Sequence, residues 1–110
     1  MFYEIRRETA IRGRGEELAR WMDEHVIPLH EAGGMTVVGT FADADDEDAF
    51  IWIRTFRDDR EREEIVDRVH RNPLFESRIK PRAEELLAGE AATVRLVPTT
   101  YSERNHTCAQ

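Results

Sequence analysis

The alternation of hydrophobic and polar residues predicts four β-strands. The first segment places Tyr3 and Ile5 on one side and Phe2, Glu4 and Arg6 on the other. Three further segments are rich in β-branched and aromatic residues, which strands favour. The predicted strands cover residues 2–8, 35–41, 50–56 and 92–97.

Helical spacing appears in the two regions between these strands. The first helix has one stripe of residues that we expect to face the sheet, and it ends at Gly33 and Gly34, with Pro28 bending or ending its last turn. The stripe is Leu18, Trp21, Met22, His25, Leu29 and Ala32. The second region begins with a cap at Asp58 or Asp59, is interrupted at Asn72 and Pro73, and continues over residues 74–87.

The resulting order, βαββαβ, predicts an α+β fold of the ferredoxin-like class. In that topology an antiparallel sheet carries helices on one face, and the first and third strands are neighbours at its centre. The domain spans residues 2–98, and residues 99–110 form a polar C-terminal tail.

The helix-free face of such a sheet needs a cover. We expect Phe2 and Trp52, with Phe56 as a further candidate, to lie on that face, because strand alternation places them on one side. An exposed aromatic patch of this size is uncommon in monomers. A second copy of the chain is the expected partner.

Four short motifs, in order, resemble the NIPSNAP family. They are "MFYEIR" at the start, "VVGTF" in the second strand, "FIWIRTF" in the third and the Arg-rich "RDDREREE" that follows. The resemblance covers residues 2–98. It implies a homodimer in which two sheets face each other as a dimeric α/β barrel with the helices outside, and it does not specify a reaction.

Charge and composition exclude several classes of partner. The chain of 110 residues has a formal net charge of -7, and its Lys and Arg residues are dispersed among acidic ones. A nucleic-acid-binding surface is therefore not expected. No apolar run is long enough to span a membrane, and the single cysteine, Cys108, cannot form an internal disulfide. We expect a cytoplasmic protein.

Arg54 lies between Trp52 and Phe56 on one side of the third strand. Glu4, on the neighbouring first strand, is the expected partner, because a buried guanidinium must be paired. Two interpretations remain open. The pair is either a structural ion pair, or part of a pocket in which Trp52 and surplus positive charge bind a carboxylate or enolate.

His25 is the candidate catalytic residue. If it faces the sheet, a neutral imidazole there could act as a general base. Tyr3 is expected to point toward the first helix and to line a pocket with Trp21 and His25. The alternative is that all three are core residues.

Neither a metal nor a cofactor is predicted. The acidic segment from Asp43 to Asp48 lacks the glycine and the final glutamate of a calcium loop. Three functions remain: a homodimeric protein that binds a small aromatic or carboxylate-bearing metabolite, a cofactor-independent monooxygenase, isomerase or cyclase that uses His25 as its base, and a purely structural or interaction module. The sequence does not decide whether the protein is an enzyme.

Overall fold

The computed structural model describes residues 1–108 of the chain. The described elements follow the predicted order, with one additional helix at the C-terminal end. They are β1 (Phe2–Thr9), α1 (Gly15–Trp21), η1 (Met22–Val26), α2 (Ile27–Ala32), β2 (Thr36–Asp43), β3 (Asp46–Phe56), α3 (Asp59–Arg71), η2 (Phe75–Ile79), α4 (Lys80–Leu86), β4 (Ala92–Leu96) and α5 (Thr100–Cys108).

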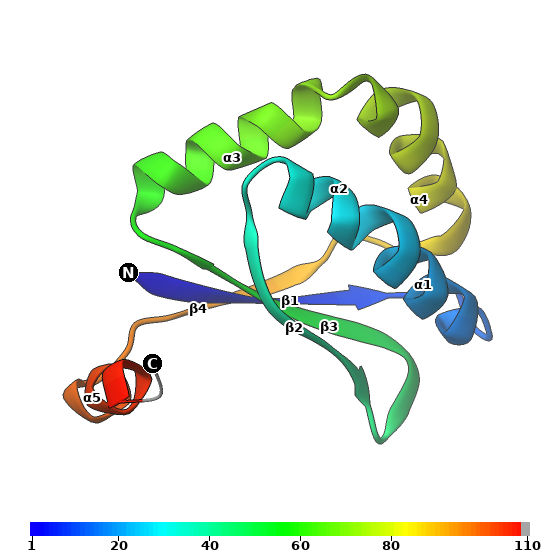
Figure 1. Ribbon diagram of the computed structural model, residues 1–110. Coiled ribbons are helices and arrows are strands. Elements are labelled where there is room, and N and C mark those ends of the chain that lie inside the picture. Colours follow the sequence, from blue (N-terminus) through cyan, green and yellow to red (C-terminus); the bar gives the residue numbers. More distant parts are fainter. Residues whose placement is uncertain (109–110) are drawn as a thin grey trace.

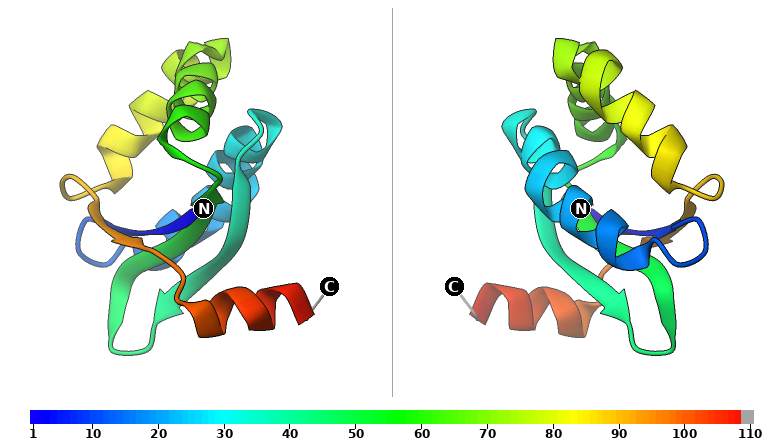
Figure 2. Two further views of the ribbon diagram at one scale, coloured as in Figure 1. Left: turned by 90° about the vertical axis from the view of Figure 1, so that its left-hand side faces the viewer. Right: turned by 90° about the vertical axis from the view of Figure 1, so that its right-hand side faces the viewer.

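The four strands form one antiparallel sheet in the order β2-β3-β1-β4. The first and third strands are therefore the central pair, and the predicted ferredoxin-like fold is confirmed. Helices α1 to α4 all lie on one side of the sheet (Figures 1 and 2). The other side is left without a helical layer.

The assignment of the two sheet faces was wrong. Phe2, Trp52 and Phe56 do not lie on the open face: they are at most 6% exposed and belong to the core beneath the helices. Strand alternation sorts residues into two sets but does not say which set faces the helices. The buried set mixes aromatic with charged residues and the other set is mainly aliphatic, so the pattern did not point to the set that faces the helices.

The open face instead carries mostly aliphatic residues. The strand register places Tyr3 opposite Leu96 and Ile5 opposite Val94, on the side away from the helices. Val94 and Leu96 are 54% and 45% exposed. The residues of this open apolar face are Tyr3, Ile5, Phe41, Ile51, Ile53, Val94 and Leu96.

Two π-helical turns change the phase of the helices that cover the sheet. η1 and η2 each end two residues before a proline, Pro28 and Pro81. Proline lacks an N–H and its ring collides with the carbonyl four residues earlier. A local widening of the helix accommodates it, so the helix continues through Pro28 to Ala32 instead of ending there.

Helix α3 begins at the cap that the sequence predicted. Asp58 accepts a hydrogen bond from the backbone N–H of Glu61 at 2.8 Å. This cap fixes where α3 leaves β3, and the helix then lies across the sheet with Ile65 and Val69 buried.

Residues 100–108, within the predicted polar tail, form α5. This helix follows β4 and lies away from the helical layer (Figure 2). Residues 109 and 110 and the side chain of Cys108 lie outside the described part of the chain.

Candidate functional site

A cavity of about 310 Å³ lies between the sheet and the helical layer. Side chains of the central strands, β1 and β3, form its floor. Its walls are formed by two helical arms: the first arm is α1, η1 and α2, and the second arm is α3, η2 and α4. The residues that matter for its chemistry are Arg6, Glu8, Trp52 and Arg54 from the sheet, Trp21 and His30 from the first arm, and Arg62, His70 and Ile79 from the second.

Glu4 joins two guanidiniums beneath this cavity. Arg54 donates from Nε to Oε1 at 2.6 Å, and its Nη2 lies 2.5 Å from the same oxygen. Arg62, from α3, donates from Nε to Oε2 at 3.0 Å. Burial alone would raise the pKa of Glu4, but Arg54 and Arg62 outweigh it and hold the pKa below its ordinary value. Glu4 is therefore a carboxylate with both oxygens occupied.

Glu8 forms the second acidic centre. Its Oε2 accepts from Arg6 Nε at 2.7 Å and from the indole N–H of Trp52 at 3.1 Å. Three guanidiniums, of Arg6, Arg54 and Arg62, thus pair with only two carboxylates. The difference, three minus two, leaves one positive charge at the cavity.

Arg54 contributes both charge and aromatic contact. Its guanidinium carbon lies 4.9 Å from the centre of the Trp52 ring, within cation–π range. Two of the five guanidinium N–H groups are used on Glu4. The other three remain for a ligand or water in the cavity.

His30 presents an unprotonated nitrogen to the cavity. Its Nδ1 lies 2.7 Å from the carbonyl oxygen of Val26, which can only accept, so Nδ1 carries the proton. Burial lowers the pKa of His30, the hydrogen bond to Val26 opposes this, and the charge of Arg54 adds to the lowering. The neutral ring packs edge-on against Trp52 with centroids 5.2 Å apart. Nε2 of the neutral ring therefore carries no proton and can accept one.

The structure brings some of the predicted site residues together. Trp21, Trp52 and Arg54 all line the cavity, and Glu4 pairs with Arg54 directly below it. Tyr3 and His25 are not among the cavity residues. The expectation that Tyr3 points toward the first helix was wrong, because Tyr3 lies on the open apolar face.

The expected orientation of His25 was also wrong. His25 is exposed and lines a separate groove on the outside of the helical layer. One series of buried residues in this arm recurs at every fourth position, Leu18, Met22 and Val26, and His30 follows at the same interval. An ideal α-helix would rotate such a series off one face, but the π-turn keeps it aligned.

Sequence reasoning missed several residues of the site, among them His30, Glu8 and Arg62. His30 could have been found from the four-residue spacing if the π-turn before Pro28 had been anticipated. Glu8 has the same strand parity as Glu4 and was accessible to the same argument. Arg62 could be recognised only from the tertiary structure, because it reaches Glu4 from 58 residues away.

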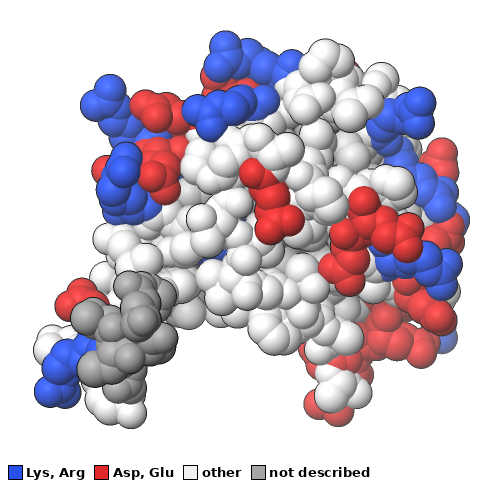
Figure 3. Space-filling view, in the orientation of Figure 1, with Lys and Arg blue, Asp and Glu red and all other residues white. Residues whose placement is uncertain are grey.

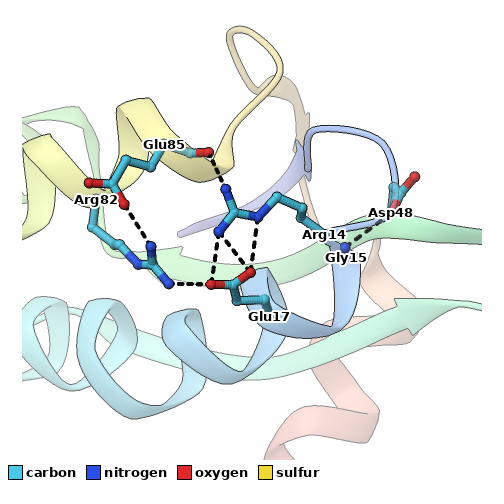
Figure 4. A network of polar contacts seen from close by, with 6 residues as sticks. All are labelled: Arg14, Gly15, Glu17, Asp48, Arg82 and Glu85. Carbon is cyan, nitrogen blue, oxygen red and sulfur yellow. Dashed lines mark hydrogen bonds and ion pairs between the residues drawn. The ribbon is translucent and has the colours of Figure 1, made fainter.

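A polar clasp, made by Arg14, Glu17, Arg82 and Glu85, joins α1 of the first arm to α4 of the second (Figure 4). Glu17 of α1 accepts from Arg14 at 2.9 and 3.0 Å and also contacts Arg82 of α4. Arg82 in turn contacts Glu85 at 2.7 Å, and Arg14 reaches the backbone oxygen of Glu85 at 3.1 Å. These contacts set the separation of the arms.

Charged side chains outside the cavity are mixed in sign. Figure 3 shows blue and red groups interspersed along the upper and right-hand edges of the molecule, with an acidic tip at the β2–β3 turn. Two of the acidic residues near this turn, Asp43 and Asp46, pair with Arg7 at 2.9 and 3.1 Å. Among the side chains that the structure describes, no cluster of His, Cys, Asp and Glu could hold a metal ion. None of the described helices is long and apolar enough to cross a membrane.

Comparison with known proteins gives similarity in structure alone. The sequence matches no protein-family profile. It is also not significantly similar to any curated protein.

Solved structures with the same fold include several NIPSNAP proteins. An uncharacterised NIPSNAP domain protein from Burkholderia xenovorans is 17% identical, with a TM-score of 0.82 over 92% of this chain and 97% of that one. A NIPSNAP family protein of unknown function from Agrobacterium tumefaciens is 22% identical, with a TM-score of 0.81 over 93% and 91%. An antibiotic biosynthesis monooxygenase is more distant, at 14% identity and a TM-score of 0.61 over 90% and 99%. The resemblance seen in the sequence motifs is thus supported, and the chain has the fold of the NIPSNAP proteins.

Proposed function

We propose that this chain is a NIPSNAP-like homodimeric protein that binds a small aromatic metabolite bearing a carboxylate or enolate, in the cavity between its sheet and its helices. The observation that carries the proposal is the excess positive charge beside Trp52, where three guanidiniums face two carboxylates. An anion placed there would restore neutrality in a partly desolvated site.

The dimensions and chemistry of the cavity support a small ligand. Its volume of about 310 Å³ is near the lower end of the usual range for small-molecule sites. The half-buried Trp21 and Phe75 supply aromatic surface, and the remaining N–H groups of Arg54 and Arg62 supply planar donors suited to a carboxylate. The fixed ion pairs below hold these donors in place before a ligand arrives.

Benzoate, as the simplest aromatic carboxylate, is the probe that tests this proposal. We expect benzoate to shift the NMR signals of cavity residues and to bind with a measurable affinity by calorimetry. Arg62→Met should weaken binding at least about tenfold, because a hydrogen bond to a charged group is lost. Arg60→Met is the matched control, since Arg60 is on the same helix and pairs with the exposed Glu64.

If millimolar benzoate leaves all cavity signals unchanged, the proposal is wrong and an interaction module becomes the better interpretation. Equal loss of affinity in Arg60→Met and Arg62→Met would also contradict it. Such a result would mean that only the overall charge matters.

A second candidate function is proton transfer by His30. It is favoured by the bare Nε2, which the hydrogen bond from Nδ1 to Val26 holds in this tautomer. Nε2 would take a proton from an acidic carbon of the ligand, and the electron pair would move to the neighbouring carbonyl oxygen to form an enolate. The guanidiniums would stabilise that oxygen, and the imidazolium would then return the proton.

Hydrogen exchange tests this candidate directly. Phenylpyruvate in D₂O should lose its methylene protons faster in the presence of the protein, as followed by proton NMR. His30→Asn retains a donor toward Val26 but has no equivalent of Nε2, so it should slow the exchange by roughly 10²- to 10⁴-fold. The control is His25→Asn, which changes an exposed histidine outside the cavity. Exchange at the same rate in His30→Asn and the unmodified protein would exclude His30 as the base.

A further inference from the structure

We propose that the ligand carries an apolar chain, and that this chain lies in the outer groove between the two helical arms while the carboxylate occupies the cavity. This inference rests on the proposed function and adds the substrate class: aryl carboxylates with an alkyl substituent. It follows from the position of the groove relative to the cavity.

The groove has a volume of about 380 Å³ and is lined by four apolar residues and by His25, Arg78 and Arg82. Trp21 and Leu29 come from the first arm, and Leu74 and Ile79 from the second. Leu74 is 51% exposed. An open apolar channel between two helices is suited to a hydrocarbon chain, which gains free energy by leaving water.

The groove and the cavity share two wall residues, Trp21 and Ile79. Trp21 comes from the first arm and Ile79 from the second, so the cavity and the groove adjoin at these two side chains. The chain of a ligand held by Arg54 and Arg62 would enter the groove by displacing the half-buried Trp21.

The charged residues of the groove do not oppose this arrangement. Arg82 lines the groove, and its guanidinium is already held by Glu17 and Glu85 (Figure 4). Arg78 forms no ion pair with any residue that the structure describes. It is exposed, and its aliphatic stem can cover a hydrocarbon chain while its charged end stays in water. The guanidiniums of the cavity therefore remain the groups that attract the carboxylate of the ligand.

A chain-length series tests the inference. Benzoate and its para-ethyl, para-butyl and para-hexyl derivatives would be titrated by calorimetry below the concentrations at which they associate. We expect affinity to rise about two- to fourfold for each added methylene, as apolar surface is buried. Leu74→Asp should flatten this rise while leaving the affinity for benzoate itself unchanged.

Ile11→Asp is the matched control, because Ile11 is 40% exposed and lies outside both spaces. It should preserve the full chain-length dependence. Equal affinity for all four probes, with benzoate still bound, would overturn the groove inference but not the proposed function. A chain-length rise that Leu74→Asp does not reduce would likewise overturn it, and failure to bind benzoate would overturn both.

Discussion

Glu4 and Arg54 are directly opposite each other in the central strand pair, and their side chains form an ion pair that is 4% exposed on both sides. Trp52 and Phe56 pack against the Arg54 guanidinium, with ring centres 4.9 and 5.7 Å from its carbon atom. Glu4 also contacts Arg62. The same residues thus hold the centre of the fold and orient the donors of the cavity.

Removing Arg54 should therefore be costly. Arg54→Met leaves a buried carboxylate with a single partner at its edge, and we expect a loss of about 3 to 5 kcal/mol in the free energy of unfolding. Arg62→Met should cost about 1 kcal/mol or less, because Arg62 is 29% exposed and its pair is partly hydrated. Urea denaturation would measure both.

The double variant Glu4→Met/Arg54→Met distinguishes the cost of leaving Glu4 without its partner from the net contribution of the ion pair to the free energy of unfolding. It removes both buried charges, so we expect it to recover most of the stability lost in Arg54→Met. A stable Arg54→Met protein, within about 1 kcal/mol of the unmodified chain, would show that the pair contributes little.

The sequence predicted the elements and their order because these depend on local signals. Alternation marked the strands, Asp58 marked the start of α3, and Gly33 with Gly34 marked the end of the first helical arm. The Glu4 and Arg54 pairing could also be inferred, since both residues have the same strand parity. These conclusions required only which residues share a side, not which side is buried.

The parts that failed depend on tertiary context. The aromatic and charged set of the sheet can face the helices because its charges pair with one another, Arg54 with Glu4 and Arg6 with Glu8. The two carboxylates gain further hydrogen bonds there from Arg62 and from the indole N–H of Trp52. His30 lines the cavity in place of the predicted His25 because the π-turn η1 changes the phase of the helix. A fixed period of 3.6 residues cannot represent this change. Both errors moved the candidate site to the wrong place.

Gly15 provides a second test of the packing between α1 and the sheet. A Cβ at this position would lie 1.8 Å from the backbone oxygen of Glu47, and the backbone there cannot yield easily. The N–H of Gly15 is also held by Asp48 at 3.1 Å (Figure 4). We expect Gly15→Ala to lower the free energy of unfolding by about 3 kcal/mol or more, as severe overpacking does.

Gly89→Ala is the control for this substitution, because a Cβ there would meet nothing within 4 Å. Its stability in urea should stay within about 0.5 kcal/mol of the unmodified chain. If Gly15→Ala is equally well tolerated, the close approach of α1 to the β3 strand is not rigid.

The open apolar face predicts how the proposed dimer would respond to charge. Leu96→Asp places a carboxylate among Tyr3, Phe41 and the aliphatic residues of that face, and we expect it to convert the dimer to a monomer in light scattering. Leu74→Asp alters an equally exposed leucine on the helical side and should remain dimeric. A monomeric unmodified protein at micromolar concentration would remove the basis of this prediction and of the proposed homodimer.

His30 should give the protein a distinct dependence of stability on pH. Its pKa is held below the ordinary value of about 6.5, so between the two values the unfolded chain binds a proton that the folded chain does not. Stability contributed by neutral His30 is therefore present above about pH 6.5 and is lost as the pH falls toward the lowered pKa. The window for Glu4, whose pKa is also lowered, lies below its ordinary value of 4.5 and does not overlap the upper part of this range. Urea unfolding between about pH 5.5 and 7.5 should show the loss in the unmodified protein and in His25→Asn, and a smaller slope in His30→Asn. Identical slopes in all three proteins would mean that His30 is protonated as readily in the folded chain as in the unfolded one, and that its Nε2 is not the poised acceptor that the cavity geometry indicates.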